Sequence, residues 1–256
     1  MTSEVVLVER RGQVLEITLN RPERRNAITR DVSERIAAAL EELDANSELR
    51  VGILTGAGGY FSSGMDLRAL TDGESAWLPE RGFAGIVKRA ATKPLIAAVE
   101  GFAVAGGFEI LLACDLVVAS RAAYFSIPEV KRCLVPIGGG IVRLAERLPE
   151  NVARELVLTG ESMDAERAAA FGLVNRLTEP GAALDAAREL AEKIAANAPL
   201  AVVASKKIFD ERAAWPADEL WERQDAISRP VVASSDSREG SLAFLEKREP
   251  RWQGAE

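Results

Sequence analysis

The chain has 256 residues, 48% of them hydrophobic and 28% charged, and is long enough to bury one sizeable core or a core with a small satellite domain. Its net charge of −7 argues against a nucleic-acid-binding surface, although a local cluster of positive charge could still bind a small anion. The complete absence of histidine excludes Ser–His and Cys–His nucleophile pairs, His-ligated metals and imidazole acid/base catalysis.

The two cysteines, Cys114 and Cys133, lack the CxxC spacing of a redox or metal site. We expect free, buried thiols in a reducing compartment. The N-terminus carries charges throughout, with no apolar segment typical of a signal peptide. The longest apolar stretch, 94–119, is interrupted by carboxylates and is predicted to be buried core rather than a membrane span. The expected location is the cytoplasm, with neither membrane nor nucleic acid as a partner.

The first third of the chain predicts strands, one helix and a glycine-rich loop. Short β-rich runs at Val5–Val8 and Val14–Leu19 favour a hairpin. Thr29 is suited to cap a helix through Leu43, because apolar residues recur there at helical spacing. The run "LRVGILTG" predicts a buried strand that leads into the Gly/Ser loop "AGGYFSSG" and a more polar segment through about Arg81.

The middle of the chain repeats the order strand, glycine turn and helix. The runs "PLIAAVEG" and "LVVAS" predict strands, and "GGFEILLACD" between them predicts a helix entered through glycines. A short strand and a loop are expected in "AYFSIPEVKRCLVPIGGG". This order is typical of layered α/β folds, which bind ligands where a strand turns into a helix.

From about Arg143 the chain is predicted to be mainly helical, with one short strand at "LVNRLTE". A domain boundary is expected near 195–200. Glycine, proline and serine stand near the helix ends, as stop and start signals should. The predicted helices are Asp164–Phe171, Gly181–Ala195, Pro199–Asp210, Pro216–Ser228 and Ser237–Lys247.

The glycine clusters do not match nucleotide-binding or serine-hydrolase motifs. Phe61 replaces the third glycine of a GxGxxG pattern, and glycines 138–140 lead into no GK[ST] sequence. A different chemistry fits Ser63–Gly64 and Gly106–Gly107, which can present free backbone N–H groups from a turn and a helix start. Two such donors converging on one point would form an oxyanion hole; otherwise these glycines are simply tight turns.

Two glutamates stand in apolar surroundings. Glu109 lies in the first turn of its predicted helix, and Glu129 follows a proline in "FSIPEV". Such carboxylates could act as acid and base on a water and a substrate, or could be ion-paired or exposed residues without chemistry. Asp115 and Asp66 are interpreted as structural turn or cap residues.

Ordered along the chain, these stretches resemble the crotonase (enoyl-CoA hydratase/isomerase) superfamily over nearly the whole length. The resemblance is carried by "LNRPERRNAIT", "VGILTGAGGYFSSGMDL", "KPLIAAVEGFAVAGGFEILLACDLVVAS", "FSIPEVKRCLVPIGGG", "GLVNRL" and "LAFLEKREPRW". It implies an α/β fold, a crotonase-like spiral of β-β-α units with the active site in residues 1–195, followed by a C-terminal helical oligomerisation region, 196–256. It also implies homotrimers or hexamers and an acyl-CoA substrate, with no separate cofactor or metal.

The same resemblance assigns roles to individual residues. The backbone N–H groups of Ser63 and Gly106 would form the oxyanion hole, and Glu109 and Glu129 would catalyse hydration of a 2-enoyl-CoA. Phe244 and Lys247 would approach CoA across a subunit boundary, or else pack in the trimer and stay solvated. The implied substrate- and CoA-binding residues are Arg24, Arg25, Ala27, Ser62, Gly64, Asp66, Leu67, Gly107, Gly139, Phe244 and Lys247.

Two residues depart from the family pattern. Ala105 stands where a third glycine is usual, and a left-handed φ there would cost energy. Ile127, two residues before Glu129, replaces an often polar residue and should raise the pKa of that glutamate. Together with "GGFE" and the tail "EGSLAFLEKREPRWQG", Ile127 points to the carnitinyl-CoA dehydratase branch as an alternative to enoyl-CoA hydratase. An enoyl-CoA delta-isomerase and a non-catalytic acyl-CoA-binding paralogue remain further alternatives, and loop 70–90 would shape the substrate pocket.

Overall fold

The computed structural model describes residues 4–254, and its largest sheet has six strands. The first two strands form an antiparallel hairpin, and the others are added in parallel. In spatial order the strands are β1 (Val6–Arg11), β2 (Val14–Leu19), β3 (Val51–Gly56), β6 (Leu95–Val99), β8 (Leu116–Ser120) and β11 (Arg176–Thr178).

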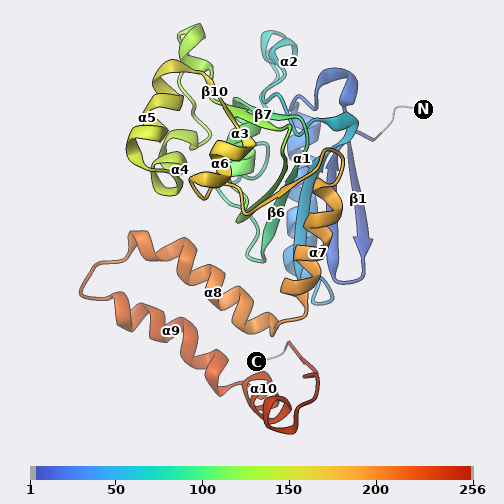
Figure 1. The fold of residues 1–256 in the computed structure, drawn as a ribbon, viewed down its shortest axis with the longest axis vertical. Coiled ribbons are helices and arrows are strands. Elements are labelled where there is room, and N and C mark those ends of the chain that lie inside the picture. The colour runs from blue at the N-terminus through green and yellow to red at the C-terminus, as the bar shows by residue number, and fades with distance from the viewer. Residues whose placement is uncertain (1–3, 255–256) are drawn as a thin grey trace.

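Helices cover both faces of this sheet (Figure 1), because its strands alternate two sets of apolar side chains. On β6, Leu95, Ala97 and Val99 belong to the core beneath α1 (Arg30–Ala45). The intervening residues pack against the alanine stripe of α7 (Ala183–Ala195) on the other face.

A second, smaller sheet lies next to the two segments that carry the predicted catalytic glutamates. It contains three strands, in the order β10 (Ser162–Asp164), β9 (Tyr124–Ser126) and β7 (Phe102–Val104). Strand β7 leads directly into α3 (Gly106–Leu112), and β9 leads to a short 3₁₀ helix, Glu129–Arg132. This sheet therefore places the two glutamate-bearing segments side by side.

Short elements complete the core. A two-stranded ribbon, β4 (Trp77–Leu78) and β5 (Gly82–Phe83), lies in the segment whose composition suggested only a polar loop. The remaining core helices are α2 (Leu67–Thr71), α4 (Gly140–Arg147), α5 (Glu150–Thr159) and α6 (Ala165–Ala170).

The last three helices form an arm that projects below the core in Figure 1. They are α8 (Pro199–Glu211), α9 (Leu220–Ala233) and α10 (Ser235–Glu246). Helices α8 and α9 bury no residue of their own in the single chain. Lys206 on α8 forms an ion pair with Asp115 at 2.5 Å and thereby ties the arm to the core. No helix among the described residues is long and apolar enough to cross a membrane.

Candidate active site

The start of α3 is held in a strained backbone conformation by Ala105. This residue has φ +52° and ψ −128°, a region that favours glycine. Its N–H donates to the Ser126 carbonyl at 2.9 Å, and its own carbonyl accepts from Glu109 N at 3.1 Å. Ala105 therefore joins β9 to the first turn of α3, and the sequence had indicated the conformational cost.

Glycines 106 and 107 allow other segments to approach the start of α3 closely. A Cβ on Gly106 would lie 2.6 Å from Cε1 of the buried Phe83 ring, and one on Gly107 would overlap the carbonyl of Ser62. From the opposite side, a Cβ on Gly64 would lie 2.7 Å from Gly106 N. The loop around Ser62–Gly64 is therefore packed directly against the N-terminus of α3, as the oxyanion-hole interpretation requires.

The two predicted oxyanion donors differ in their present partners. Gly106 N–H has no acceptor among the described residues, whereas Ser63 N–H donates to the Arg25 carbonyl at 3.0 Å. One donor is thus free, and the second would have to share or exchange its hydrogen bond to bind a substrate oxygen.

Glu109 is the central carboxylate of the site. It is only 4% exposed, and its Oε1 accepts a hydrogen bond from Gly140 N at 3.0 Å. Burial raises the pKa of its carboxyl, and the N–H groups of Gly140 and Gly138 oppose that rise. The pKa also depends on Arg143, whose positive charge lowers it. The hydrogen bond from Gly140 fixes Oε1 of Glu109, and Gly138 lies beside Oε2.

The run Gly138–Gly140 makes room for this carboxylate. A Cβ on Gly138 would lie 2.7 Å from Glu109 Oε2, and one on Gly140 would lie 2.9 Å from Cδ1 of Ile127. Gly138 and Gly140 therefore lie against Glu109, whereas the predicted Gly139 lies against Arg143. The sequence displayed all three but did not show which side chain they face.

Glu129 begins its 3₁₀ helix directly after Pro128, and its Oε2 is buried without a hydrogen-bond partner among the described groups. Burial raises the pKa of this carboxyl, and the negative charge of Glu109 raises it further. Ile127 is fully buried beside it, so the predicted direction of the shift is confirmed. The two glutamates therefore form a coupled pair suited to holding and moving a proton.

The predicted CoA-binding loop runs beside the oxyanion segment. Ile28 N donates to the Gly64 carbonyl at 2.8 Å, and Asp66 N donates to the Ile28 carbonyl at 2.9 Å. Arg24 and Arg25 are exposed at the edge of this pair of segments, whereas Ala27 is buried beneath it.

Asp66 has the structural role expected from its position. Its carboxylate caps α2 by accepting from Arg68 N and is paired with Arg21 at 3.0 Å. Leu67, the next residue, is the exposed first residue of that helix. Asp115 is likewise structural, because it accepts from Leu95 N at 2.7 Å.

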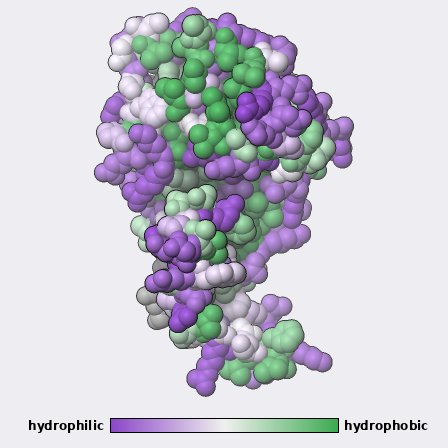
Figure 2. All heavy atoms as spheres, turned by 90° about the vertical axis from the view of Figure 1, so that its left-hand side faces the viewer, coloured by the Kyte–Doolittle hydropathy of each residue, from purple (hydrophilic) through white to green (hydrophobic). Residues whose placement is uncertain are grey.

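A cavity of about 1390 Å³ lies between the core and α8. Trp77, Lys88 and Gly138 are among the core residues that line it. The Lys88 ammonium lies over the Trp77 ring, 5.6 Å from its centroid. Figure 2 shows the molecule narrowing at this level, between the upper core and the arm. The cavity begins at Gly138, which packs against Glu109, yet neither Glu109 nor Glu129 lines it.

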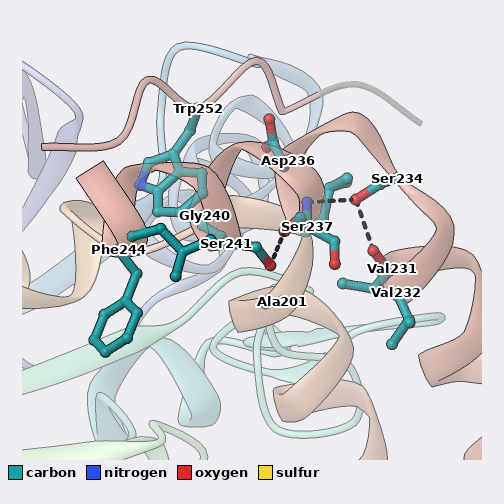
Figure 3. A pocket seen from close by; sticks show the side chains of 13 residues that line it. Ala201, Val231, Val232, Ser234, Asp236, Ser237, Gly240, Ser241, Phe244 and Trp252 are labelled. Carbon is teal, nitrogen blue, oxygen red and sulfur yellow. Dashed lines mark hydrogen bonds between the residues drawn. The ribbon is translucent and has the colours of Figure 1, made fainter. Parts of the chain in front are cut away.

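Phe244 and Lys247 are not brought to the site within one chain. Both belong to the α10 end of the arm, remote from α3 in Figure 1, and Phe244 is 84% exposed. Phe244 lines a separate groove of about 580 Å³ between α8, α9 and α10, where Trp252 also lies (Figure 3).

The prediction of two buried thiols was wrong for Cys133. Cys114 is fully buried, which raises the pKa of its thiol to about 12, but Cys133 is exposed. Cys133 ends the 3₁₀ helix in a left-handed conformation, so it lies on a surface turn rather than in the core. No cluster of side chains among residues 4–254 has the composition of a metal site.

Sequence reasoning missed three contributors to the site. Phe83 covers Gly106, Arg143 holds the glycine run, and the Ser126 carbonyl anchors Ala105. Only the glycine run offered a signal, because close approach is a usual reason for consecutive glycines.

Comparison with known proteins shows that enoyl-CoA hydratases have the fold described above. Residues 9–255 match the family model of enoyl-CoA hydratase/isomerase. The crystal structure of enoyl-CoA hydratase EchA1 from Mycobacterium marinum is 54% identical, covers 99% of this chain and 100% of that chain, and has a TM-score of 0.97. This similarity confirms the predicted crotonase-like α/β fold.

Curated relatives carry two different names. Enoyl-CoA hydratase EchA19 from Mycobacterium tuberculosis is 44% identical over 254 residues, which cover 96% of each chain. Carnitinyl-CoA dehydratase from Citrobacter koseri is 42% identical over 260 residues, covering 98% of this chain and 99% of its own.

Proposed function

Because the chain belongs to the enoyl-CoA hydratase/isomerase family, we propose that it catalyses the reversible addition of water to a 2-enoyl-CoA thioester. The observation that carries this proposal is the coupled pair of buried Glu109 and half-buried Glu129 beside a free helix-start N–H. Hydration needs a group that activates water and a group that delivers a proton, and the pair provides both.

In the proposed mechanism, the thioester carbonyl accepts a hydrogen bond from Gly106 N–H, joined by Ser63 N–H when its bond to Arg25 is exchanged. Glu109 takes a proton from water, whose oxygen forms a bond to the β-carbon. The electrons of the C=C bond move to the carbonyl oxygen as an enolate, which the two N–H groups stabilise. Glu129 then delivers a proton to the α-carbon and restores the thioester.

The two raised pKa values suit these tasks. A carboxyl with a raised pKa keeps its proton to a higher pH and can donate it, and the same raised pKa makes the ionised carboxylate a stronger base. An isomerase that moves one proton between carbons could work with a single carboxylate. Keeping both therefore favours hydration over isomerisation and over acyl-CoA binding alone.

We further propose that the acyl group is uncharged. The Trp77 face that could bind a trimethylammonium group already carries the Lys88 ammonium. Arg143 also lines the same cavity. The carboxylates of Asp115 and Glu146 line this cavity as well, so the preference for an uncharged acyl group rests on the Trp77 face that Lys88 occupies. Carnitinyl-CoA dehydratase is the second candidate, which the 42%-identical relative supports.

The test is an absorbance assay on a panel of 2-enoyl-CoA thioesters that includes crotonyl-CoA and crotonobetainyl-CoA. We expect wild type to hydrate crotonyl-CoA faster than crotonobetainyl-CoA, and Glu129→Gln to lose about 100-fold or more in kcat. Lys88→Met should reduce the ratio of the hydration rates of crotonyl-CoA and crotonobetainyl-CoA. If neither wild type nor Glu129→Gln hydrates any thioester of the panel while both still bind CoA, the hydratase proposal is wrong and acyl-CoA binding is the better explanation.

The active protein is proposed to be a homotrimer or hexamer in which α10 of one copy completes the CoA site of another. The support is the exposure of Phe244 on an arm that buries little of its own surface. Arg24 and Arg25 are proposed to face the CoA phosphates from the other side. A cytoplasmic location is proposed from the two cysteines, which are both free.

A further inference from the structure

Arg143 connects two segments that are far apart in sequence. It lies on α4, and its Nη1 donates to the Gly138 carbonyl at 3.1 Å while its Nη2 donates to the Val87 carbonyl at 2.6 Å. A Cβ on Gly139 would overlap Nη1, so that glycine leaves space for the guanidinium. The arginine thus joins the glycine run to the loop that shapes the substrate pocket.

The same glycine run controls Glu109. Gly140 N–H holds Oε1 at 3.0 Å, and Gly138 lies against Oε2 so closely that a Cβ there would approach to 2.7 Å. A small movement of the run would therefore displace the carboxylate. Because proton transfer depends on hydrogen-bond geometry, such a displacement would slow the reaction.

We propose that Arg143 is a positioning residue of the hydration site: it holds Gly138–Gly140 so that Gly140 N–H fixes the Glu109 carboxylate toward water. The inference rests on the proposed hydratase activity. Arg143 acts through the glycine run and takes no part in the bonds that form or break.

Charge gives Arg143 a second effect on the same carboxylate. Its guanidinium is half-buried, and its positive charge lowers the pKa of Glu109, against the effect of burial. Removal of that charge should raise the pKa of Glu109, so that a higher pH is needed to ionise the base. The other charged or titratable groups around this pair are Glu129, Glu146, Arg147 and Cys114.

Three variants separate positioning from mere packing. Arg143→Gln removes both the positive charge and the forked guanidinium that donates to the Gly138 and Val87 carbonyls. Arg143→Lys keeps the charge but not the fork. Arg147→Gln, one turn later on α4, is the matched control. Arg147 donates to the Cys114 carbonyl, and among the described residues it makes no hydrogen bond to the glycine run. For Arg143→Gln we expect a loss of about 10- to 100-fold in kcat, little change in KM, and an acidic limb of the kcat profile shifted to higher pH. Arg143→Lys should lose less and keep the wild-type limb, as should Arg147→Gln.

Titration of carboxyl groups by ¹³C NMR gives a readout that is independent of turnover. Glutamate-labelled wild type is compared with Glu109→Gln to assign the Glu109 signal, which is then followed in the Arg143 variants. An upward shift of this titration in Arg143→Gln supports the proposal, even if wild type hydrates no thioester and the hydratase assignment fails. If the pKa of Glu109 and the acidic limb of the kcat profile are both unchanged in Arg143→Gln, the proposal is overturned. If Arg143→Gln does not fold, Arg143→Lys decides: wild-type kcat would exclude positioning by the fork.

Discussion

At the scale of single residues, Ala105 has a strained backbone conformation at the point where β9 is joined to the first turn of α3. Its φ of +52° lies where a side chain strains the backbone by about 1–3 kcal/mol. The hydrogen bonds on both sides of it fix this conformation. The sequence identified Ala105 as unusual because glycine is typical at this position of the family. Only the structure shows that the alanine keeps the positive φ that favours glycine.

Relief of this strain should stabilise the protein. We expect Ala105→Gly to raise the free energy of unfolding by about 1 kcal/mol, since the strain removed exceeds the entropy that glycine adds. Urea unfolding measures the difference. Ala103→Gly on β7, where φ is ordinary, is the matched control and should destabilise. Equal changes in both variants would contradict the explanation by strain.

The carboxylates show what sequence can and cannot establish about single residues. Burial of Glu109 followed from its apolar run, and Ile127 predicted the direction in which the pKa of Glu129 is shifted. The partner of Glu109 could not be derived, because Gly140 lies 31 positions away and donates through its main chain. Main-chain donors carry no residue-type signature in sequence.

At the scale of elements, Gly107 and Gly138 should respond differently to an added methyl group. At Gly107 the methyl would overlap a backbone carbonyl that is fixed by β7, whereas at Gly138 it meets the carboxylate end of the Glu109 side chain, which can turn aside. We expect Gly107→Ala to lower the free energy of unfolding by about 1–3 kcal/mol or more. Gly138→Ala should cost little stability but at least about 10-fold in kcat.

Paired measurements of urea unfolding and crotonyl-CoA hydration on both variants check this contrast. Each variant serves as the control for the other, because both add one methyl group beside the same site. A Gly107→Ala protein as stable as wild type would show that the loop at Ser62 can move away from α3.

Most of the longer elements could be predicted, because periodicity and capping residues mark them. Thr29 caps α1 as predicted, and β8 has the predicted limits, whereas Asp164, predicted as the first residue of α6, is its N-cap. The three-residue strands β7 and β10 and the two-residue strands β4 and β5 are too short to show a period, so they were missed. Helix α9 begins at Leu220, four residues after the proline expected to start it, and it continues past Pro230.

At the scale of the whole molecule, apolar side chains remain uncovered on two surfaces. One lies over the elements at the left of Figure 1 and forms the upper green area of Figure 2. The exposed large apolar side chains of the segment 134–142 and of α5 are Leu134, Val135, Ile137, Ile141, Val142 and Leu158. The other surface is on the arm, where Trp221 is 72% and Leu245 is 75% exposed. Exposed apolar surface of this extent is typical of subunit interfaces.

Light scattering should therefore give the mass of three or six copies of the 27.5 kDa chain. Leu245→Glu, which places a charge in the proposed interface, should shift the population toward monomer. Val8→Glu makes the same kind of change at an exposed position on the edge strand β1 and should leave the mass unchanged. A wild-type monomer would exclude the proposed assembly.

The fold as a whole was accessible from the sequence through its family resemblance and through the alternating strands that build two packed faces. The placement of the arm was not, since amphipathic patterns show that a helix has an apolar side but not which surface covers it. Phe244 illustrates this: its sequence position suggested a role near CoA, yet its own chain leaves it 84% exposed.

The free N–H of Gly106 has a consequence for how this catalyst can evolve. A main-chain donor survives almost any replacement of its own side chain, so residue 63 of the proposed oxyanion hole can vary while its N–H group is kept. The constraint passes instead to the glycines at 64, 106 and 107, where every larger residue collides with a neighbouring segment. Selection would then preserve empty space rather than a functional group, and new acyl-CoA chemistry could arise by changing the carboxylates while that space is inherited intact.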